Sequence, residues 1–195
     1  MNQQEIIERF RRTDALLEGH FQLTSGLHST HYLQCARVLQ YPREAAAFGE
    51  AIAEHYRDAR IETIAAPAIG GIIIGHEVAR ALNAKFIFTE REQGIMTLRR
   101  GFTIGEGERT LVVEDVITTG GSTRETINAL NSRGAHVIAA ASIIDRSNSR
   151  ADVGIPRIAL ATLDVPVFNP ADCPACARGE AAVKPGSRRE VMSDE

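Results

Sequence analysis

Long apolar runs are missing from this sequence. The longest candidate, residues 63–75, is interrupted by one proline and two glycines and is shorter than the roughly 18 residues that a membrane-spanning helix needs. The first twenty residues mix charged with apolar side chains and lack the continuous apolar core of a secretory signal. We therefore expect neither a membrane span nor export.

Cysteine is scarce, and charge of one sign is not in excess. An odd number of cysteines, three, in a chain long enough to bury a core argues against a disulfide framework and for a reducing cytoplasm. The net charge is −3, from 22 basic and 25 acidic residues. With 44% hydrophobic and 24% charged residues, the 195-residue chain has the composition of one globular domain rather than of a disordered or nucleic-acid-coating protein.

Short apolar runs alternate with helical patterns along most of the chain. Near-helical spacing of apolar side chains predicts a helix over 3–18, and Pro42, at a favoured first helical position, begins a second one over 42–58. Predicted strands then lie at 63–66, 86–88, 111–113 and 137–144, with predicted helices between them at 72–82 and 122–132. This β-α-β order predicts an α/β fold with a parallel sheet covered on both faces.

Two segments carry no such pattern. Residues 90–109 are charged, contain four glycines and join two predicted strands without a helix. A loop this long is usually functional or mobile, although by itself it also fits a surface hairpin. From about Gly179 to Glu195 the chain is polar, and we expect this tail to fray.

The most informative stretch is LVVEDVITTGGST, residues 111–123. A buried strand leads into Glu114 and Asp115, and a turn of small residues leads into a helix whose start is marked by an S-x-x-E capping box, Ser122 and Glu125. Ligands of open parallel sheets bind beyond the carboxyl ends of strands, where the two acids fall. The alternative is that these acids only end a strand and cap a helix.

The turn after the acids suits a phosphate monoester. Backbone N–H groups at Gly120 and Gly121, with the hydroxyls of Thr118, Thr119 and Ser122, would surround it at the positive end of a helix. Paired acids suit a metal or two vicinal hydroxyls, and a phosphate beside such hydroxyls describes a ribose 5-phosphate. Neither a Walker A motif nor a G-x-G-x-x-G motif follows a strand, which argues against an ATPase or a dinucleotide-binding protein.

Residues 111–123 closely resemble the phosphoribosyl-diphosphate (PRPP) signature of type I phosphoribosyltransferases. Residues 19–34, GHFQLTSGLHSTHYLQ, resemble the hood of the orotate-specific members, and residues 66–71 and 144–146 extend the likeness over about residues 5–176. The resemblance implies a single domain over 1–195 with a Rossmann-like parallel-sheet core. Its parts would be a hood at about 1–40, a core at about 41–165 and a C-terminal tail at about 166–195.

The resemblance also implies an activity, which is Mg²⁺-dependent transfer of ribose 5-phosphate from PRPP to orotate in pyrimidine biosynthesis. The products are orotidine 5′-monophosphate and diphosphate. The implied enzyme is a cytoplasmic homodimer with shared active sites; Mg²⁺ is bound through PRPP, and no protein-held metal, nucleic acid or membrane partner is expected.

The same resemblance assigns site residues. The implied catalytic residues are Glu114, Asp115 and Arg91, and the implied orotate contacts are Thr118 and Arg146, whose planar fork can bind a carboxylate at two oxygens. The implied PRPP contacts are Ala68, Ile69, Gly70, Gly71, Arg91, Arg99, Arg100, Glu114, Asp115, Val116, Ile117, Thr118, Thr119, Gly120, Gly121 and Ser122.

Two positions depart from the family pattern. Gly70 stands where many members carry a lysine in the diphosphate loop, and Thr24 stands where some carry a lysine beside the Ser-Gly of the hood. The cationic charge must therefore come from the arginines of residues 90–100.

Cysteines and histidines outside these motifs could bind a metal, but their spacing argues against it. Cys173 and Cys176 have the spacing of metal ligands, yet no second C-x-x-C and no nearby histidine pair is visible in the sequence, which favours free thiols. His20, His28 and His31 in the hood are not spaced as a helical metal face, which favours hydrogen bonding in turns or near substrate.

Two other functions would share residues 111–123. A purine or xanthine phosphoribosyltransferase leaves the hood and Arg146 unexplained. A PRPP-sensing transcriptional regulator would need a basic DNA-binding segment, and neither that nor a winged-helix-like N-terminal extension is visible.

Overall fold

The computed structural model describes residues 1–23 and 25–184. The chain divides into two units, one of Met1–Ala15 with Cys35–Asp164, the other of Leu16–Gln34 with the chain from Val165 onward. Within the described residues, no helix is long and apolar enough to cross a membrane.

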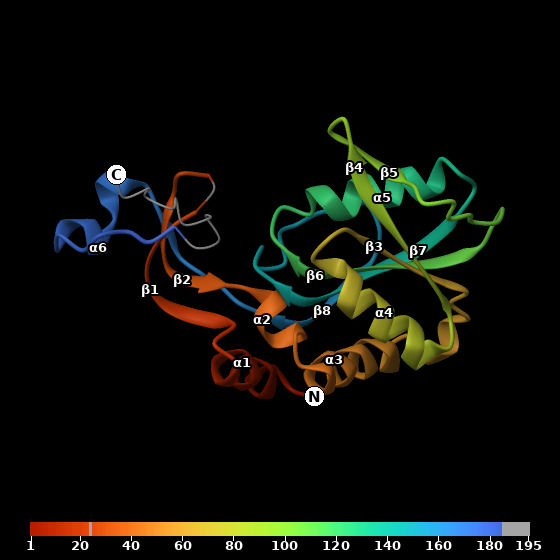
Figure 1. The fold of residues 1–195 in the computed structure, drawn as a ribbon, viewed down its shortest axis with the longest axis horizontal. Helices are drawn as coiled ribbons and strands as arrows, with labels where there is room; N and C mark the ends of the chain where they lie inside the picture. The colour runs from red at the N-terminus through yellow and green to blue at the C-terminus, as the bar shows by residue number, and fades with distance from the viewer. Residues whose placement is uncertain (24, 185–195) are drawn as a thin grey trace, which may run out of the picture. The chain divides into compact units, whose positions relative to one another are not determined.

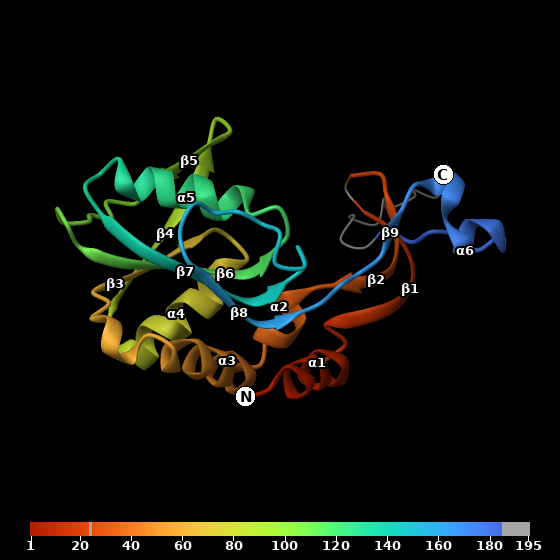
Figure 2. The same cartoon turned by 180° about the vertical axis from the view of Figure 1, so that it is seen from behind.

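A six-stranded sheet forms the centre of the first unit, in the order β5-β4-β3-β6-β7-β8 (Figures 1 and 2). Five strands run parallel, and the edge strand β5 pairs antiparallel with β4. The strands are β3 (Thr63–Pro67), β4 (Lys85–Glu92), β5 (Ile95–Leu98), β6 (Arg109–Ile117), β7 (His136–Asp145) and β8 (Arg157–Thr162). The expected α/β architecture is confirmed.

Helices cover both faces of this sheet. On one face α4 packs against α3 and against β3 and β6, and on the other α5 packs against β3, β5, β6 and β7 (Figure 1). The central strands are therefore buried on both sides, which explains their continuous apolar runs in place of alternation. The helices are α1 (Gln3–Arg12), α2 (Cys35–Leu39), α3 (Pro42–Glu54), α4 (Gly71–Leu82) and α5 (Gly121–Asn131), with a 3₁₀ turn at Arg57–Ala59.

Two predicted helices end earlier than expected. The prediction of a helix over 3–18 is wrong after Arg12, because Asp14 takes a left-handed backbone conformation and the Ala15 amide bonds back to the Phe10 carbonyl at 2.8 Å. The following apolar residues then begin a strand. The prediction over 42–58 is wrong after Glu54, where the chain tightens into the 3₁₀ turn.

Residues 90–98 belong to a β-hairpin, which is one of the two alternatives that the sequence left open for residues 90–109. β4 continues to Glu92, and both Gln93 and Gly94 have positive φ values, which let the chain reverse into β5. Arg91 pairs with Met96 and Glu90 with Thr97 across the two strands. The arginine-rich segment therefore begins on an ordered β4–β5 hairpin.

The second unit is built on a three-stranded antiparallel sheet, in the order β1-β2-β9. Its elements are β1 (Leu16–Gln22), β2 (His28–Leu33), β9 (Val167–Phe168), a 3₁₀ turn at Pro170–Asp172 and α6 (Pro174–Ala177). Val183 also bridges to Phe21. The sequence placed residues from 165 onward in a C-terminal tail, but β9 pairs with the hood hairpin, which consists of β1 and β2. Residues 185–195, part of the tail that we expected to fray, lie outside the described residues.

Candidate functional site

Two glycines at the junction of β3 and α4 lie against the two acids of β6: Gly70 directly precedes the helix, and Gly71 is its first residue. A Cβ atom at Gly70 would lie 2.8 and 2.9 Å from the carboxylate oxygens of Asp115, closer than real Cβ atoms approach. A Cβ atom at Gly71 would lie 2.9 Å from the carbonyl oxygen of Val113 and 3.3 Å from Oε1 of Glu114. The structure therefore brings together two motifs that the sequence separates by more than forty residues, and glycine is what permits this approach.

The two acids are close to each other in a buried setting. Glu114 is 8% exposed and Asp115 is half-buried. Burial, with the adjacent Asp115 charge, raises the pKa of Glu114 to about 9, and burial also raises the pKa of Asp115. Near neutral pH the pair therefore holds a proton, which an arriving cation or hydroxyl donor can displace.

Cys35 lies next to this acid pair, a position that the sequence did not predict. It is buried on α2, and its thiol hydrogen-bonds the Asp115 carboxyl. Burial, followed by the charge of Asp115, raises the pKa of Cys35 well above its usual value. No motif marks this cysteine, because its partner Asp115 lies 80 residues away in the chain.

The turn after the acids forms a hollow of about 70 Å³, lined by Glu114 and residues 116–123. Gly120 has φ +77°, and a Cβ atom there would meet Val153 at 2.8 Å, so glycine is required on both counts. The predicted capping box is wrong: α5 begins at Gly121 after Gly120, and no side chain caps it. The N–H groups of its first turn are thus placed to donate to an anion.

Arg146 follows β7 directly and lies beside the end of β6. Its amide donates to the Ile117 carbonyl at 2.8 Å, which ties the two strand ends together. Buried Asp145 accepts from the Ser147 amide at 2.7 Å and pairs with Arg157 at 3.0 Å. Burial by itself would raise the pKa of Asp145, but these partners hold it below its usual value. Asp145 thus fixes the backbone that carries the half-buried Arg146.

The three arginines predicted to bind PRPP are exposed and each is paired with a carboxylate. Arg91 pairs with Glu125 of α5 at 2.7 Å and donates to the Gly94 carbonyl at 2.9 Å. Arg99 pairs with Glu92, and Arg100 makes a two-pronged contact with Glu90. A ligand that recruits these arginines must compete with their carboxylate partners.

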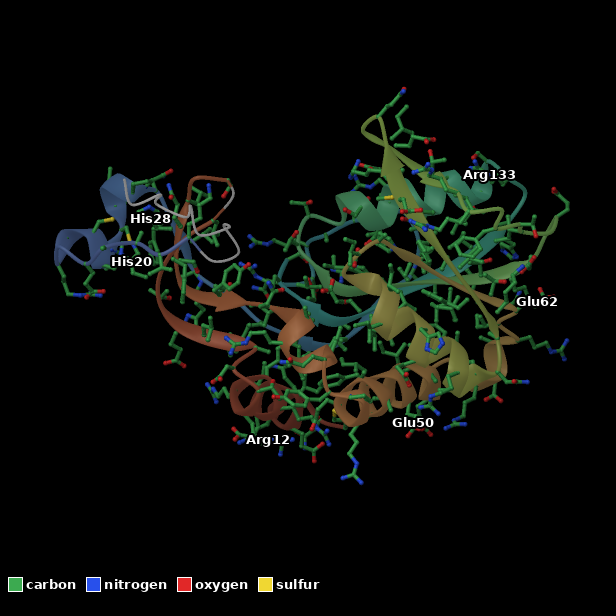
Figure 3. The ribbon with its side chains drawn as sticks, viewed as in Figure 1. Arg12, His20, His28, Glu50, Glu62 and Arg133 are labelled. Atoms are coloured by element: carbon green, nitrogen blue, oxygen red, sulfur yellow. The ribbon has the colours of Figure 1, made fainter. Side chains whose placement is uncertain are left out.

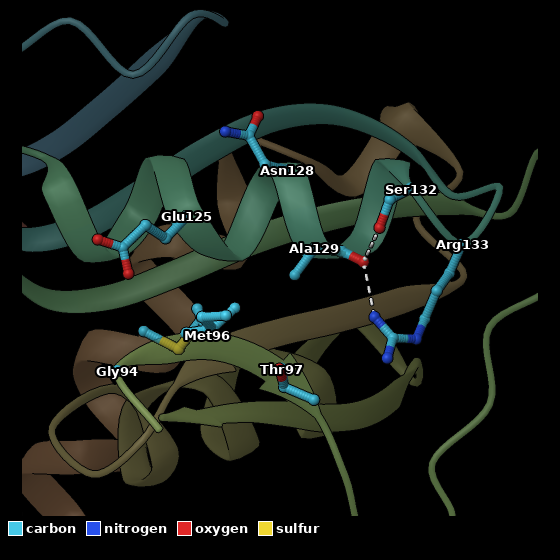
Figure 4. A pocket seen from close by; sticks show the side chains of 9 residues that line it. Gly94, Met96, Thr97, Glu125, Asn128, Ala129, Ser132 and Arg133 are labelled. Carbon is cyan, nitrogen blue, oxygen red and sulfur yellow. Dashed lines mark hydrogen bonds between the residues drawn. The ribbon is translucent and has the colours of Figure 1, made fainter. Parts of the chain in front are cut away.

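A wider groove of about 500 Å³ lies between the hairpin and α5 (Figure 4). Gly94, Met96 and Thr97 line one side of it, and Glu125 and Arg133 lie on the other. The Arg133 guanidinium donates back to the Ala129 carbonyl of α5 at 3.2 Å. This groove contains neither acid of β6 and is distinct from the hollow at the start of α5.

Among the remaining predicted positions, Thr24 lies outside the described residues. In the second unit, His20 and His28 contact Cys173 and Cys176, which the sequence spacing did not suggest. His31 hydrogen-bonds Thr30 instead.

Comparison with known proteins identifies the family. Residues 34–164 match the model of the phosphoribosyl transferase domain. The orotate phosphoribosyltransferase of Caldicellulosiruptor bescii is 51% identical over 190 residues, which cover 97% of this chain and 100% of that protein. This chain belongs to the orotate phosphoribosyltransferases.

Solved structures agree with this family membership. Orotate phosphoribosyltransferase from Aeropyrum pernix matches with a TM-score of 0.67 and 27% identity, covering 81% of this chain and 93% of that one. The Mycobacterium tuberculosis orotate phosphoribosyltransferase in complex with PRPP matches with a TM-score of 0.64 over 83% of this chain and 96% of that one, and at 21% identity it shows the shared fold. The predicted fold, family and enzyme class are confirmed.

Proposed function

We propose that this orotate phosphoribosyltransferase transfers ribose 5-phosphate from PRPP to N1 of orotate, giving orotidine 5′-monophosphate and diphosphate, at the carboxyl ends of β3, β6 and β7. The observation that carries this proposal is the contact of Gly70 and Gly71 with the carboxylates of Asp115 and Glu114, next to the uncapped start of α5. One site thereby offers an acid pair, a phosphate-sized hollow and a glycine loop.

Each part of PRPP has a chemical counterpart in this site. The 5′-phosphate accepts from the first-turn N–H groups of α5 and from the hydroxyls of Thr118, Thr119 and Ser122. The 2′- and 3′-hydroxyls of the ribose donate to Glu114 and Asp115. Backbone N–H groups of residues 69–71 donate to the diphosphate, whereas the Ala68 N–H, which the resemblance also implied as a donor, is already bonded to the Thr89 carbonyl at 2.8 Å.

Mg²⁺ enters with PRPP in this proposal. Carboxylate and phosphate oxygens are the donors that Mg²⁺ prefers, and the buried, proton-holding acid pair fits a cation that arrives with its substrate. Mg²⁺ supplies charge neutralisation at the leaving diphosphate.

The chain contributes positioning and electrostatics rather than a nucleophile. Transfer at C1′ passes through an oxocarbenium-like state, so holding the ribose between the acids and the glycine loop lowers the barrier. Ionised Glu114 and Asp115 also lie where they can stabilise positive charge developing on the sugar. No covalent intermediate with the enzyme is required.

Arg146 is the proposed partner of the orotate carboxylate, with Thr118 as a second orotate contact. A guanidinium can bind two carboxylate oxygens at once, and the hydrogen bonds to Asp145 keep the loop that carries it in place. Purine bases carry no carboxylate, so Arg146 favours orotate over hypoxanthine or xanthine.

The activity test is direct. Loss of orotate absorbance should require both PRPP and Mg²⁺, and hypoxanthine and xanthine should be inert under the same conditions. Purine turnover with inert orotate would refute the substrate assignment, and PRPP binding without turnover of any base would instead favour a regulator.

We further infer a cytoplasmic homodimer in which the Arg91 hairpin of one subunit closes over PRPP of the other. In the single chain Arg91 is held by Glu125 and Gly94 of its own subunit, and Ile95 at the hairpin tip is 70% exposed. Closing this hairpin would exclude water and bring cationic charge to the leaving diphosphate. Three free cysteines fit a reducing compartment.

Mixing two inactive variants tests the shared site. Arg91→Ala and Asp115→Asn would damage opposite halves, so a mixed dimer has one site with both lesions and one intact site. Subunit exchange should restore up to about a quarter of wild-type activity, because half of the dimers are mixed and each has one good site. No recovery, with exchange verified by a tag pull-down, would place the hairpin in its own subunit's site.

A further inference from the structure

Four side chains of the second unit converge on one point. His20 of β1 and His28 of β2 lie close together (Figure 3). They meet Cys173, which directly precedes α6, and Cys176, which lies within it. Their ligating atoms all lie within 4.8 Å of one another. His20 and Cys173 are 153 residues apart in the chain, so the spacing of the two cysteines does not reveal their histidine partners.

The distances within the group are close to those between the ligands of one small ion, and the two imidazole nitrogens lie nearer each other than a bound ion would hold them. Nε2 of His20 is 2.8 Å from Nδ1 of His28 and 3.5 Å from Sγ of Cys173. Sγ of Cys176 is 3.2 Å from Nδ1 of His28 and 3.7 Å from Nε2 of His20. Tetrahedral zinc with bonds of about 2.05 Å to nitrogen and 2.3 Å to sulfur places its ligand atoms roughly 3.3–3.8 Å apart.

The surroundings are those of a closed structural site. His20, His28 and Cys173 are each less than 8% exposed, and Cys176 is half-buried. Backbone N–H groups of Cys176 and Ala175 hydrogen-bond the Cys173 sulfur, as outer contacts of a metal-bound thiolate do. Four protein ligands leave no open coordination position, which is the pattern of a structural rather than a catalytic metal.

The tautomer of His20 supports metal binding. Its Nδ1 lies 2.9 Å from the backbone carbonyl of Glu180, and a carbonyl can only accept, so Nδ1 carries the proton. In the neutral ring, Nε2 therefore presents a lone pair to the two cysteines and to His28. A carbonyl on the far nitrogen is the usual partner that orients a zinc-bound histidine.

We propose that one Zn²⁺ ion is bound by His20, His28, Cys173 and Cys176. The ion would connect the C-terminal segment, residues 165–184, to the hood hairpin formed by β1 and β2. Binding releases the thiol protons of the two cysteines, because the thiolate is the ligand. An S₂N₂ tetrahedral donor set selects zinc over Mg²⁺, which prefers oxygen, so this site is separate from the metal that enters with PRPP.

A metal gives this part of the chain stability that its core cannot supply. β9 has only two residues, and the chain beyond α6 is held to β1 by the paired backbone contacts of Val183 with His20 and Gln22, at 2.8 Å each. Small units with little apolar core are commonly stabilised by a metal or by disulfides. The two histidines come from the hairpin and the two cysteines from the C-terminal segment, so one ion joins both.

Metal analysis of the whole protein, purified without chelator or affinity nickel, tests the proposal. We expect about one zinc per chain in the wild type and less than about 0.1 in Cys176→Ser and His28→Gln. His31→Gln is the matched control: it changes a histidine on the same strand, outside the cluster, and should keep its zinc. Wild type that neither contains zinc nor takes it up would overturn the proposal, as would equal zinc in all variants or stoichiometric iron.

Two measurements on the unmutated protein keep the test valid if a variant misfolds. Cobalt substitution should give the visible spectrum of tetrahedral cobalt with thiolate charge-transfer bands. Chelation should lower the melting temperature by several degrees and speed hydrogen exchange in residues 165–184 but not in β6, and added zinc should reverse both changes. An octahedral cobalt spectrum, or a Cys173–Cys176 disulfide in fresh protein that zinc does not prevent, would contradict the site.

Discussion

Replacing Glu114 by glutamine should stabilise the protein while damaging its function. Burial raises the pKa of Glu114 from its ordinary value near 4.5 to about 9. Between these two pH values the native state holds a proton that the unfolded state has lost. The free energy of unfolding therefore falls as the pH rises through this window, by about 1.4 kcal/mol per pH unit for one proton.

The glutamine variant removes this proton uptake and keeps the shape of the side chain. From pH 6 to pH 8, the stability of Glu114→Gln relative to wild type should increase by about 3 kcal/mol. For a chain of this size, that corresponds to a relative rise in melting temperature of roughly 5–11 °C. Activity at limiting PRPP should fall, because an amide is a weaker acceptor than a carboxylate for the ribose hydroxyls.

Urea unfolding at pH 6, 7 and 8 measures the effect. Glu90→Gln is the control: Glu90 is a half-buried acid whose pKa is lowered chiefly by its hydrogen bond to Arg100, so it is ionised in both states across this range. Its stability relative to wild type should not change with pH. If Glu114→Gln ran parallel to wild type from pH 6 to 8, the buried acid would not hold the proton, and the electrostatic description of the site would be refuted.

Three further substitutions test the parts of the site separately. Arg146→Ala should weaken orotate binding by about 10- to 100-fold, the loss of one charge-assisted pair, and leave PRPP binding intact; equal loss for both ligands in calorimetry would count against its role. Gly70→Ala should raise the KM for PRPP, because its Cβ atom would push the Asp115 carboxylate aside. Gly121→Ala should fold with an unchanged melting temperature, because its Cβ atom would approach only Thr119, at 3.6 Å. Asp115→Asn should lower kcat/KM with the fold retained in circular dichroism, and normal turnover at limiting PRPP would make this acid a structural residue.

The sequence predicted the structure best where it depends on residues that are neighbours in the chain. Residues 111–123 combine a buried strand, two acids and a glycine turn, and their positions in β6 and at the start of α5 follow from that order. The capping box failed because Gly120 already turns the chain, and Glu125 pairs with Arg91 instead of with the helix start.

What could not be predicted depends on contacts between distant segments. Leu17 continues the apolar spacing of α1, but pairing with Tyr32 places it in β1. Cys35 of α2 contacts Asp115 of β6, and Cys173 and Cys176 near the end of the chain meet histidines near its beginning. Periodicity within one segment contains no information about such partners.

Calorimetric titration of PRPP with Mg²⁺ at pH 8, in buffers of different ionisation enthalpy, tests the central claim most directly. If Glu114 and Asp115 hold a proton and then accept the ribose hydroxyls, binding to wild type should release close to one proton, corrected for protonation of the ligand itself. Glu114→Gln should bind more weakly and release little or none. Equal affinity and equal proton release in the two proteins would contradict the assignment of this acid pair to PRPP.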